Sequence, residues 1–153
     1  MDLQDFVRKY IWDQEKTPYF RSVRRLTKSQ ADNEIKIYAI FLGTIFTIME
    51  ILSASTWVDT GEFMPGVVAV YCAFLVATAV MIWRHKDVRA ALFCVTAPIA
   101  TAMNFMFDGF HGELHEVDRY ILIGFCLLWL RYTLRVLSIC RRYDNMPQRP
   151  TRI

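Results

Sequence analysis

The sequence contains few of the residues from which enzymes build catalytic or phosphate-binding sites. Its 153 residues include six glycines, four cysteines and three histidines. We find no Gly-rich phosphate-binding loop, no Ser/His/Asp arrangement and no histidine placed for haem ligation, so we do not expect an enzyme. No two cysteines are close in sequence, which argues against a zinc motif or a disulfide framework and predicts four small buried side chains. They are Cys72, Cys94, Cys126 and Cys140.

Charge is missing from two long runs. Phe63–Trp83 is 21 residues without a charged side chain, and Ala90–Phe107 is another 18. Uncharged apolar runs of this length are typical of transmembrane helices and are too long for ordinary soluble core helices. The apolar content of 54% points the same way. A soluble enzyme and an intrinsically disordered chain are therefore both disfavoured.

Two further apolar segments carry very little charge. Ile37–Val58 contains only Glu50, and Tyr120–Cys140 contains only Arg131 and Arg135. Each segment is long enough to cross a hydrocarbon core of about 30 Å at about 1.5 Å per residue. The apolar runs are continuous, without the alternation of a membrane barrel. The sequence therefore predicts an all-α integral membrane protein, a bundle of four transmembrane helices.

This prediction divides the chain into three parts. Residues 1–34 form a cytoplasmic amphipathic and basic arm, residues 35–142 the four-helix transmembrane domain, and residues 143–153 a cytoplasmic tail. No cleavable signal peptide is expected before the first span, because the first 34 residues are polar and carry both signs of charge.

Basic residues are almost absent from two of the segments that flank the predicted spans. Residues 59–62 and 108–119 hold one basic residue, Arg119, and six acids, whereas residues 1–36, 84–89 and 141–153 hold fifteen basic residues. The positive-inside rule therefore places both termini in the cytoplasm. The expected location is the bacterial inner membrane.

The arm has two parts. Apolar residues that include Phe6 and Tyr10 share one face of a predicted amphipathic helix, which ends near Trp12 and is broken at Thr17-Pro18. A basic cluster suited to anionic headgroups follows. Its members are Arg21, Arg24, Arg25 and Lys28.

Two interpretations of the arm remain open. It is either a membrane-surface anchor or a docking segment for a neighbouring subunit. Acids interleave with the bases before Ile35, which disfavours nucleic-acid binding. Beyond the arm, Thr27 and Gln30 have the spacing of a capping box, so we expect the first helix to begin near Lys28.

Charged residues at membrane depth are candidates for function. Arg131, Arg135, Ser138 and Arg142 have the spacing of one helical stripe, which we expect to face the bundle or an adjacent protein. Glu50 lies at a depth similar to that of Arg131, which allows an ion pair between the first and fourth helices. The alternatives are lone charged groups at an interface, or a path for protons or ions.

Two weaker patterns mark the middle spans. Pro98 should kink the third span and leave a carbonyl that needs a hydroxyl or a water molecule as its partner. Ala69, Ala73 and Ala77 form a small-residue stripe along the second span, which permits close helix packing.

The second outer loop contains a possible metal site. Asp108, His111, His115 and Asp118 would share one face if the loop were helical, and this set could hold a transition metal. The same set could instead form a pH-sensitive element. The other interpretation is a solvated loop or a partner contact. No other cofactor is predicted.

These patterns lead to one preferred function and one alternative. We expect a non-catalytic accessory or scaffolding subunit of a larger membrane complex, whose partners are membrane lipids and other integral membrane subunits. The alternative is a small ion-coupled transporter or channel that uses Glu50 and the stripe of Arg131 and Arg135.

Overall fold

The computed structural model describes residues 22–107 and 116–148, and every regular element in them is helical. Three helices are long and apolar enough to cross a membrane: Lys28–Thr60, Phe63–His85 and Tyr120–Asn145. The elements are η1 (Val23–Arg25), α2 (Lys28–Thr60), α3 (Phe63–His85), α4 (Val88–Phe93), α5 (Thr96–Phe107), α6 (Glu116–Arg142) and η2 (Tyr143–Asn145).

The first long helix begins where the capping box predicts. The Gln30 amide donates to Thr27 Oγ1 at 3.4 Å, and the Thr27 amide donates to Gln30 Oε1 at 3.2 Å. These two bonds satisfy amide groups that have no partner inside the helix. The Lys28 amide donates to the Pro147 carbonyl at 3.0 Å, so the end of the described chain folds back onto the start of α2.

A tight turn joins α2 to α3. Gly61 ends α2 with φ of 69°, a conformation that glycine adopts without steric cost. One turn into α3, a Cβ atom added to Gly66 would lie 3.1 Å from the Trp57 ring. The indole therefore occupies the space that the missing side chain leaves, and the two helices pack closely at this end.

The third predicted span is divided into two helices. α4 ends at Phe93 and α5 begins at Thr96. The break lies just before Pro98, because a proline ring lacks an amide hydrogen and clashes with the carbonyl four residues earlier, here that of Cys94. The Cys94 carbonyl accepts from the Ala97 amide at 3.2 Å, rather than from the hydroxyl or water molecule expected from the sequence. Thr96 Oγ1 donates to the neighbouring Phe93 carbonyl at 2.7 Å. The helical stretch Val88–Asn104, which includes this break, is apolar but shorter than the three candidate spans.

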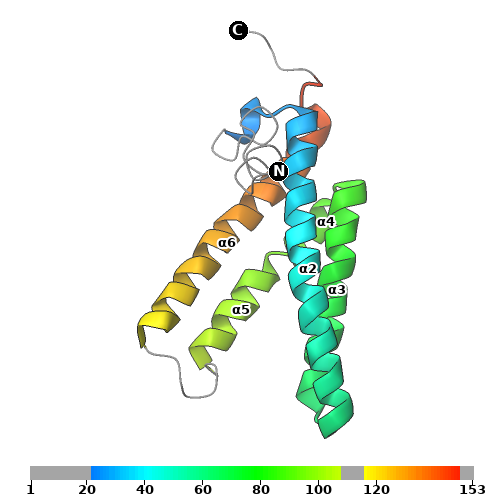
Figure 1. The fold of residues 1–153 in the computed structure, drawn as a ribbon. Helices are drawn as coiled ribbons and strands as arrows, with labels where there is room; N and C mark the ends of the chain where they lie inside the picture. The colour runs from blue at the N-terminus through cyan, green and yellow to red at the C-terminus, as the bar shows by residue number, and fades with distance from the viewer. Residues whose placement is uncertain (1–21, 108–115, 149–153) are drawn as a thin grey trace, which may run out of the picture.

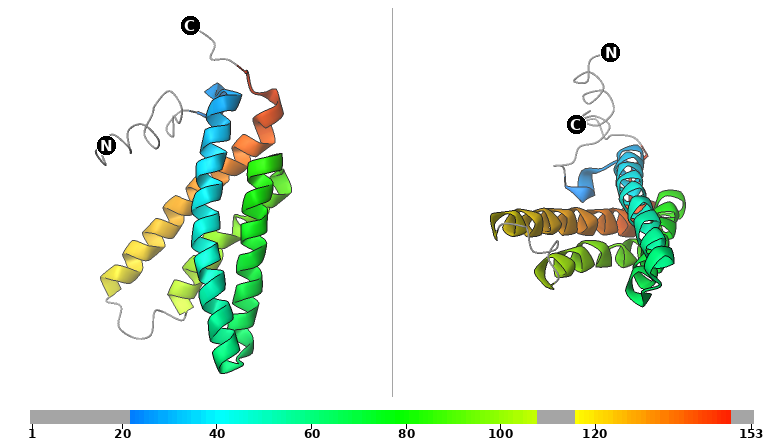
Figure 2. Two further views of the ribbon diagram at one scale, coloured as in Figure 1. Left: turned by 45° about the vertical axis from the view of Figure 1, so that its right-hand side comes forward. Right: turned by 60° about the horizontal axis from the view of Figure 1, so that its bottom comes forward.

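The helices form two hairpins that meet at one end and diverge toward the other (Figures 1 and 2). α2 and α3 lie side by side along their length, and α5 lies beside α6. α4 contacts both α3 and α6 and links the two hairpins. We call the end where the start of α2, the end of α3 and the end of α6 come together the joined end.

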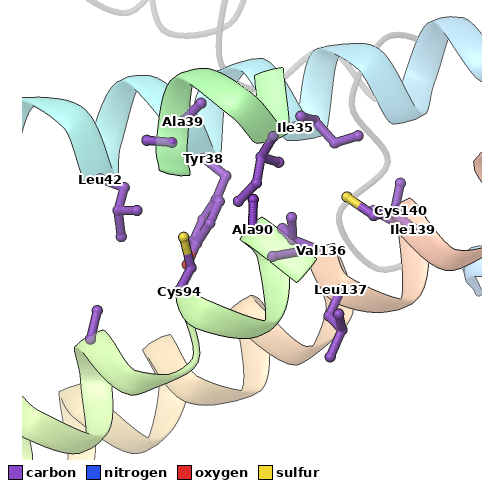
Figure 3. Close-up of a cluster of buried hydrophobic side chains, with 14 of the residues drawn as sticks. Ile35, Tyr38, Ala39, Leu42, Ala90, Cys94, Val136, Leu137, Ile139 and Cys140 are labelled. Carbon is purple, nitrogen blue, oxygen red and sulfur yellow. The ribbon is translucent and has the colours of Figure 1, made fainter. Parts of the chain in front are cut away.

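The hydrophobic core lies toward the joined end. Figure 3 shows some of its side chains, which come from α2, α4 and α6. Ile35, Leu42 and Val136 are completely buried there. No residue of α2 beyond Phe46 is buried. The core therefore fastens the hairpins together over part of their length and leaves their distal parts apart.

The small-residue stripe of α3 differs from the predicted one. Ala69 is buried, but Ala73 is only partly buried and Ala77 is exposed. The buried face follows a spacing of three and four residues and consists of Gly66, Ala69, Cys72, Leu75, Ala79 and Ile82. A strict spacing of four drifts round the helix, because one turn takes 3.6 residues.

Candidate functional site

A buried ion pair joins the two hairpins. Arg135 of α6 donates from Nε to Glu34 Oε2 at 2.9 Å and from its terminal nitrogen to Glu34 Oε1 at 2.8 Å. The Glu34 side chain is fully buried and that of Arg135 is 18% exposed. Two parallel bonds between a guanidinium and a carboxylate fix both distance and orientation.

A second ion pair ties the end of α3 to α2. Lys86 Nζ lies 3.0 Å from Asp32 Oδ1, and the Tyr143 hydroxyl donates to both oxygens of the same carboxylate. Lys28 and Lys86 each lie 5.6 Å from the centre of the Tyr143 ring, within the range of a cation–π interaction. Asp32 is therefore the meeting point of α2, α3 and the segment after α6.

The backbone of Lys86 adopts a conformation that is unfavourable for residues other than glycine. Its φ is 53°, in the left-handed region, where it ends α3 with its amide donating to the Ile82 carbonyl. The side chain compensates, because Nζ also donates to the Trp83 carbonyl at 2.6 Å. The same lysine thus closes the helix and reaches the Asp32 carboxylate.

A neutral hydrogen bond lies one turn deeper on α2. The Tyr38 hydroxyl and Thr133 Oγ1 are 2.9 Å apart, and both residues are buried. Thr133 Oγ1 donates its proton to the Trp129 carbonyl, so the Tyr38 hydroxyl is the donor to Thr133. The Trp129 ring then packs against Phe41 and Phe46, with centroid distances of 5.8 and 6.1 Å.

Together these contacts form what we call the polar clasp. It fastens α2 to α6 at two levels, through Glu34–Arg135 and Tyr38–Thr133, and at a third level Asp32 joins α2 to η2 and to the end of α3. Its members are Asp32, Glu34, Tyr38, Lys86, Thr133, Arg135 and Tyr143. Each charge in it meets an opposite charge, so the clasp is suited to holding helices in register.

The three charges predicted at membrane depth do not come together. Arg135 pairs with Glu34, and no ion pair joins Glu50 to Arg131, although the structure describes both residues. Arg131 is exposed, whereas Glu50 is partly buried. The expected stripe is thus split, because Arg135 turns toward α2 while Arg131 lies on an exposed face of α6.

Most of the other predicted site residues lie outside the part of the chain that the structure describes. This is true of Phe6, Tyr10, Trp12 and Arg21 in the arm, and of Asp108, His111 and His115 in the outer loop. Arg24 and Arg25 lie in η1 and are exposed. Asp118 lies in the first turn of α6. No metal-binding group of three His, Cys, Asp or Glu side chains occurs within residues 22–107 and 116–148.

Sequence reasoning missed Glu34, which was counted as part of the arm. A signal for it existed, because the capping box places the start of α2 at Lys28. From there Ala31, Glu34, Ile35 and Tyr38 follow the spacing of one helical face, and all four are buried. The cysteines, by contrast, are all buried and free of disulfide bonds, as predicted.

No family model, no curated protein and no solved structure matches this chain.

Proposed function

We propose that the protein is a non-catalytic accessory or scaffolding subunit of a larger membrane complex. The observation that supports this role is the distribution of burial along the apolar helices. The polar clasp and the core hold the hairpins together near the joined end, whereas α2 has no buried residue beyond Phe46. The distal parts of the helices thus present apolar surface to their surroundings that other subunits can cover.

The proposal includes a four-span topology with both termini in the cytoplasm of a bacterium. α2, α3 and α6 are three spans, and α4 with α5 forms a broken third span in chain order. Charge supports the orientation, because residues 22–36, 84–89 and 135–148 hold ten Lys or Arg against four Asp or Glu. At the opposite end, residues 59–62 hold two acids and no base. The basic end is expected to face the cytoplasm.

The arm would then work on the cytoplasmic side, either as a surface anchor or by docking to a neighbouring subunit. Reporter fusions at residues 61, 87, 112 and 153 test the topology. A cytoplasmic reporter should be active after 87 and 153, and a periplasmic reporter after 61 and 112. The same sidedness at 87 and 112 would contradict a third crossing.

Purification from the native membrane tests the role itself. The full-length tagged chain is extracted in mild detergent, and the proteins that elute with it are quantified by mass spectrometry. We expect integral membrane partners at a fixed stoichiometry. The matched control is an equally tagged multi-pass protein expressed at the same level. A preparation that contains only this chain would overturn the accessory role.

We do not propose the transporter or channel alternative. Such a role needs polar groups that line one path through the membrane. Arg135 is closed in an ion pair with Glu34, Arg131 is exposed, and neither is paired with Glu50.

A further inference from the structure

A polar cavity lies beside the polar clasp at the joined end. It has a volume of about 220 Å³ and lies between the end of α3 and the segment where α6 passes into η2. One water molecule takes up about 30 Å³ in the liquid, so the cavity has room for a group of several heavy atoms. The side chains that line it are Arg84, His85, Lys86, Cys140, Tyr143 and Asp144.

The basic part of the lining comes from one short stretch of chain. Arg84, His85 and Lys86 are consecutive, and Lys86 ends α3 in the left-handed conformation. Arg84 and His85 are exposed, whereas Cys140 on the other side of the cavity is buried. The cavity therefore opens at the surface among basic side chains and ends against the core.

Hydrogen-bond donors in the lining remain available for a ligand. The side chains of Arg84 and His85 form no hydrogen bond or ion pair with any residue in 22–107 and 116–148. A guanidinium has five N–H donors and an ammonium has three. Lys86 Nζ uses two of its three on the Asp32 carboxylate and the Trp83 carbonyl. The cavity thus offers the whole Arg84 fork and one further ammonium hydrogen.

The charge around the cavity favours an anion. The two ion pairs of the clasp cancel and add no net charge. Outside the clasp, residues 22–36, 84–89 and 135–148 hold eight Lys or Arg and two Asp or Glu. Asp144 supplies a carboxylate to the lining, and it is exposed to solvent, where its charge is screened. A ligand with negative charge therefore meets a positive field at this end.

The cavity lies where two candidate spans end. α3 ends at His85, and the candidate span Tyr120–Asn145 reaches through η2. Trp83, which is 43% exposed, comes directly before the basic stretch, and exposed tryptophans gather where the hydrocarbon core meets the headgroups. In the proposed topology the cavity is therefore level with the cytoplasmic headgroups. Basic pockets between helices at this level bind phosphate headgroups.

We infer that this cavity binds a phosphate group, the chemistry that an anionic phospholipid headgroup shares with a soluble phosphate ester. The Arg84 guanidinium donates two parallel N–H bonds to two phosphate oxygens, and Lys86 adds a third donor and a second positive charge. The Asp144 carboxylate repels the ligand and limits its affinity. This binding site depends on the proposed function only for its place on the cytoplasmic face.

Titration of the purified full-length chain tests the site. In a neutral maltoside detergent, the protein is titrated separately with dioctanoyl phosphatidylglycerol, dioctanoylglycerol and glycerol 3-phosphate, and native mass spectrometry measures the bound fraction. We expect saturable binding of one phosphate-bearing molecule and none of dioctanoylglycerol, which lacks phosphate. Binding of phosphatidylglycerol without glycerol 3-phosphate identifies a lipid site. Saturable binding of glycerol 3-phosphate identifies a site for soluble phosphate esters.

Three variants locate the binding. Arg84→Gln should weaken it at least roughly tenfold, because a charge-assisted pair is lost. The matched control is Arg89→Gln, which removes the same charge from an exposed residue outside the lining and should change affinity by less than about twofold. Asp144→Asn should strengthen binding about two- to fivefold, a gain that damage to the fold cannot produce.

Circular dichroism and monodisperse elution show that each variant is folded. Should Arg84→Gln fail to fold, the gain in Asp144→Asn decides the matter. The inference is wrong if neither phosphate compound binds saturably, if dioctanoylglycerol binds as tightly as phosphatidylglycerol, or if Arg84→Gln and Arg89→Gln weaken binding equally. Absence of partner subunits in a native preparation would overturn the accessory role and leave these affinities unchanged, so the two failures are distinguishable.

Discussion

Glu34 and Arg135 are 101 residues apart in sequence and form a two-point ion pair with N–O distances of 2.9 and 2.8 Å. Glu34 is fully buried, so the pair lies where an uncompensated charge has a large free-energy cost. With the Tyr38–Thr133 hydrogen bond, it holds α6 in register on α2. Removing this ion pair should therefore lower the free energy of unfolding of the whole bundle.

The first prediction concerns this pair. Glu34→Gln should lower the free energy of unfolding by about 3–5 kcal/mol, because it leaves the Arg135 guanidinium partly buried without its carboxylate. The double variant Glu34→Met with Arg135→Met should lose much less, since two apolar side chains remove the unpaired charge. Reversible unfolding in mixed detergent micelles measures both. The prediction is contradicted if Glu34→Gln loses less unfolding free energy than the double variant does.

The second prediction concerns the Tyr38–Thr133 hydrogen bond. Tyr38→Phe removes a buried hydroxyl that donates to Thr133, and it should cost about 1 kcal/mol of unfolding free energy. Tyr120→Phe is the matched control, because Tyr120 is 73% exposed and should lose almost nothing. Equal losses at the two tyrosines would show that the buried bond adds no stability.

The third prediction concerns the close packing of α2 on α3. Gly66→Ala places a methyl group 3.1 Å from the Trp57 ring, so either the indole or the helix must shift, at a cost of about 1–3 kcal/mol. Gly124→Ala meets no atom within 4 Å and should stabilise α6 by up to about 1 kcal/mol through helix propensity. Thermal unfolding of the two variants should shift in opposite directions. If the unfolding temperatures of both variants shifted in the same direction, packing of Gly66 against Trp57 would not be the cause of the change at Gly66.

The fourth prediction separates the backbone of Lys86 from its side chain. Lys86→Ala and Lys86→Gly both remove the ion pair with Asp32, but only glycine adopts φ of 53° without a steric penalty. We expect Lys86→Gly to be more stable than Lys86→Ala by about 1–2 kcal/mol. Chemical denaturation of the two purified variants gives this difference directly. Equal stabilities of Lys86→Gly and Lys86→Ala would show that the left-handed backbone at residue 86 carries no steric penalty.

The sequence was most informative about features that depend on local patterns. The capping box at Thr27 and Gln30, the break before Pro98 and the three long apolar helices all follow from residues near one another in the chain. Such features are governed by backbone geometry and hydropathy, which a single sequence displays.

Contacts between distant segments were harder to predict. Arg131 and Arg135 are both arginines on one expected stripe, and only the crossing of α6 on α2 determines which of them meets a carboxylate. Depth along the spans suggests Glu50 as one possible partner for Arg131, whereas Glu34 occupies the face and level of α2 that Arg135 reaches. Pairing across helices depends on tilt and rotation, which periodicity within one helix does not encode.

In the proposed four-span topology, the division of α4 from α5 bears on how the chain enters the membrane. α5 has 12 residues, which span about 18 Å, well short of a hydrocarbon core of about 30 Å. Such a helix is too short to insert by itself, and its neighbour α6 carries five arginines, of which Arg131 and Arg135 lie within its apolar stretch. In the proposed topology, α5 and α6 would therefore enter the membrane together as a helical hairpin.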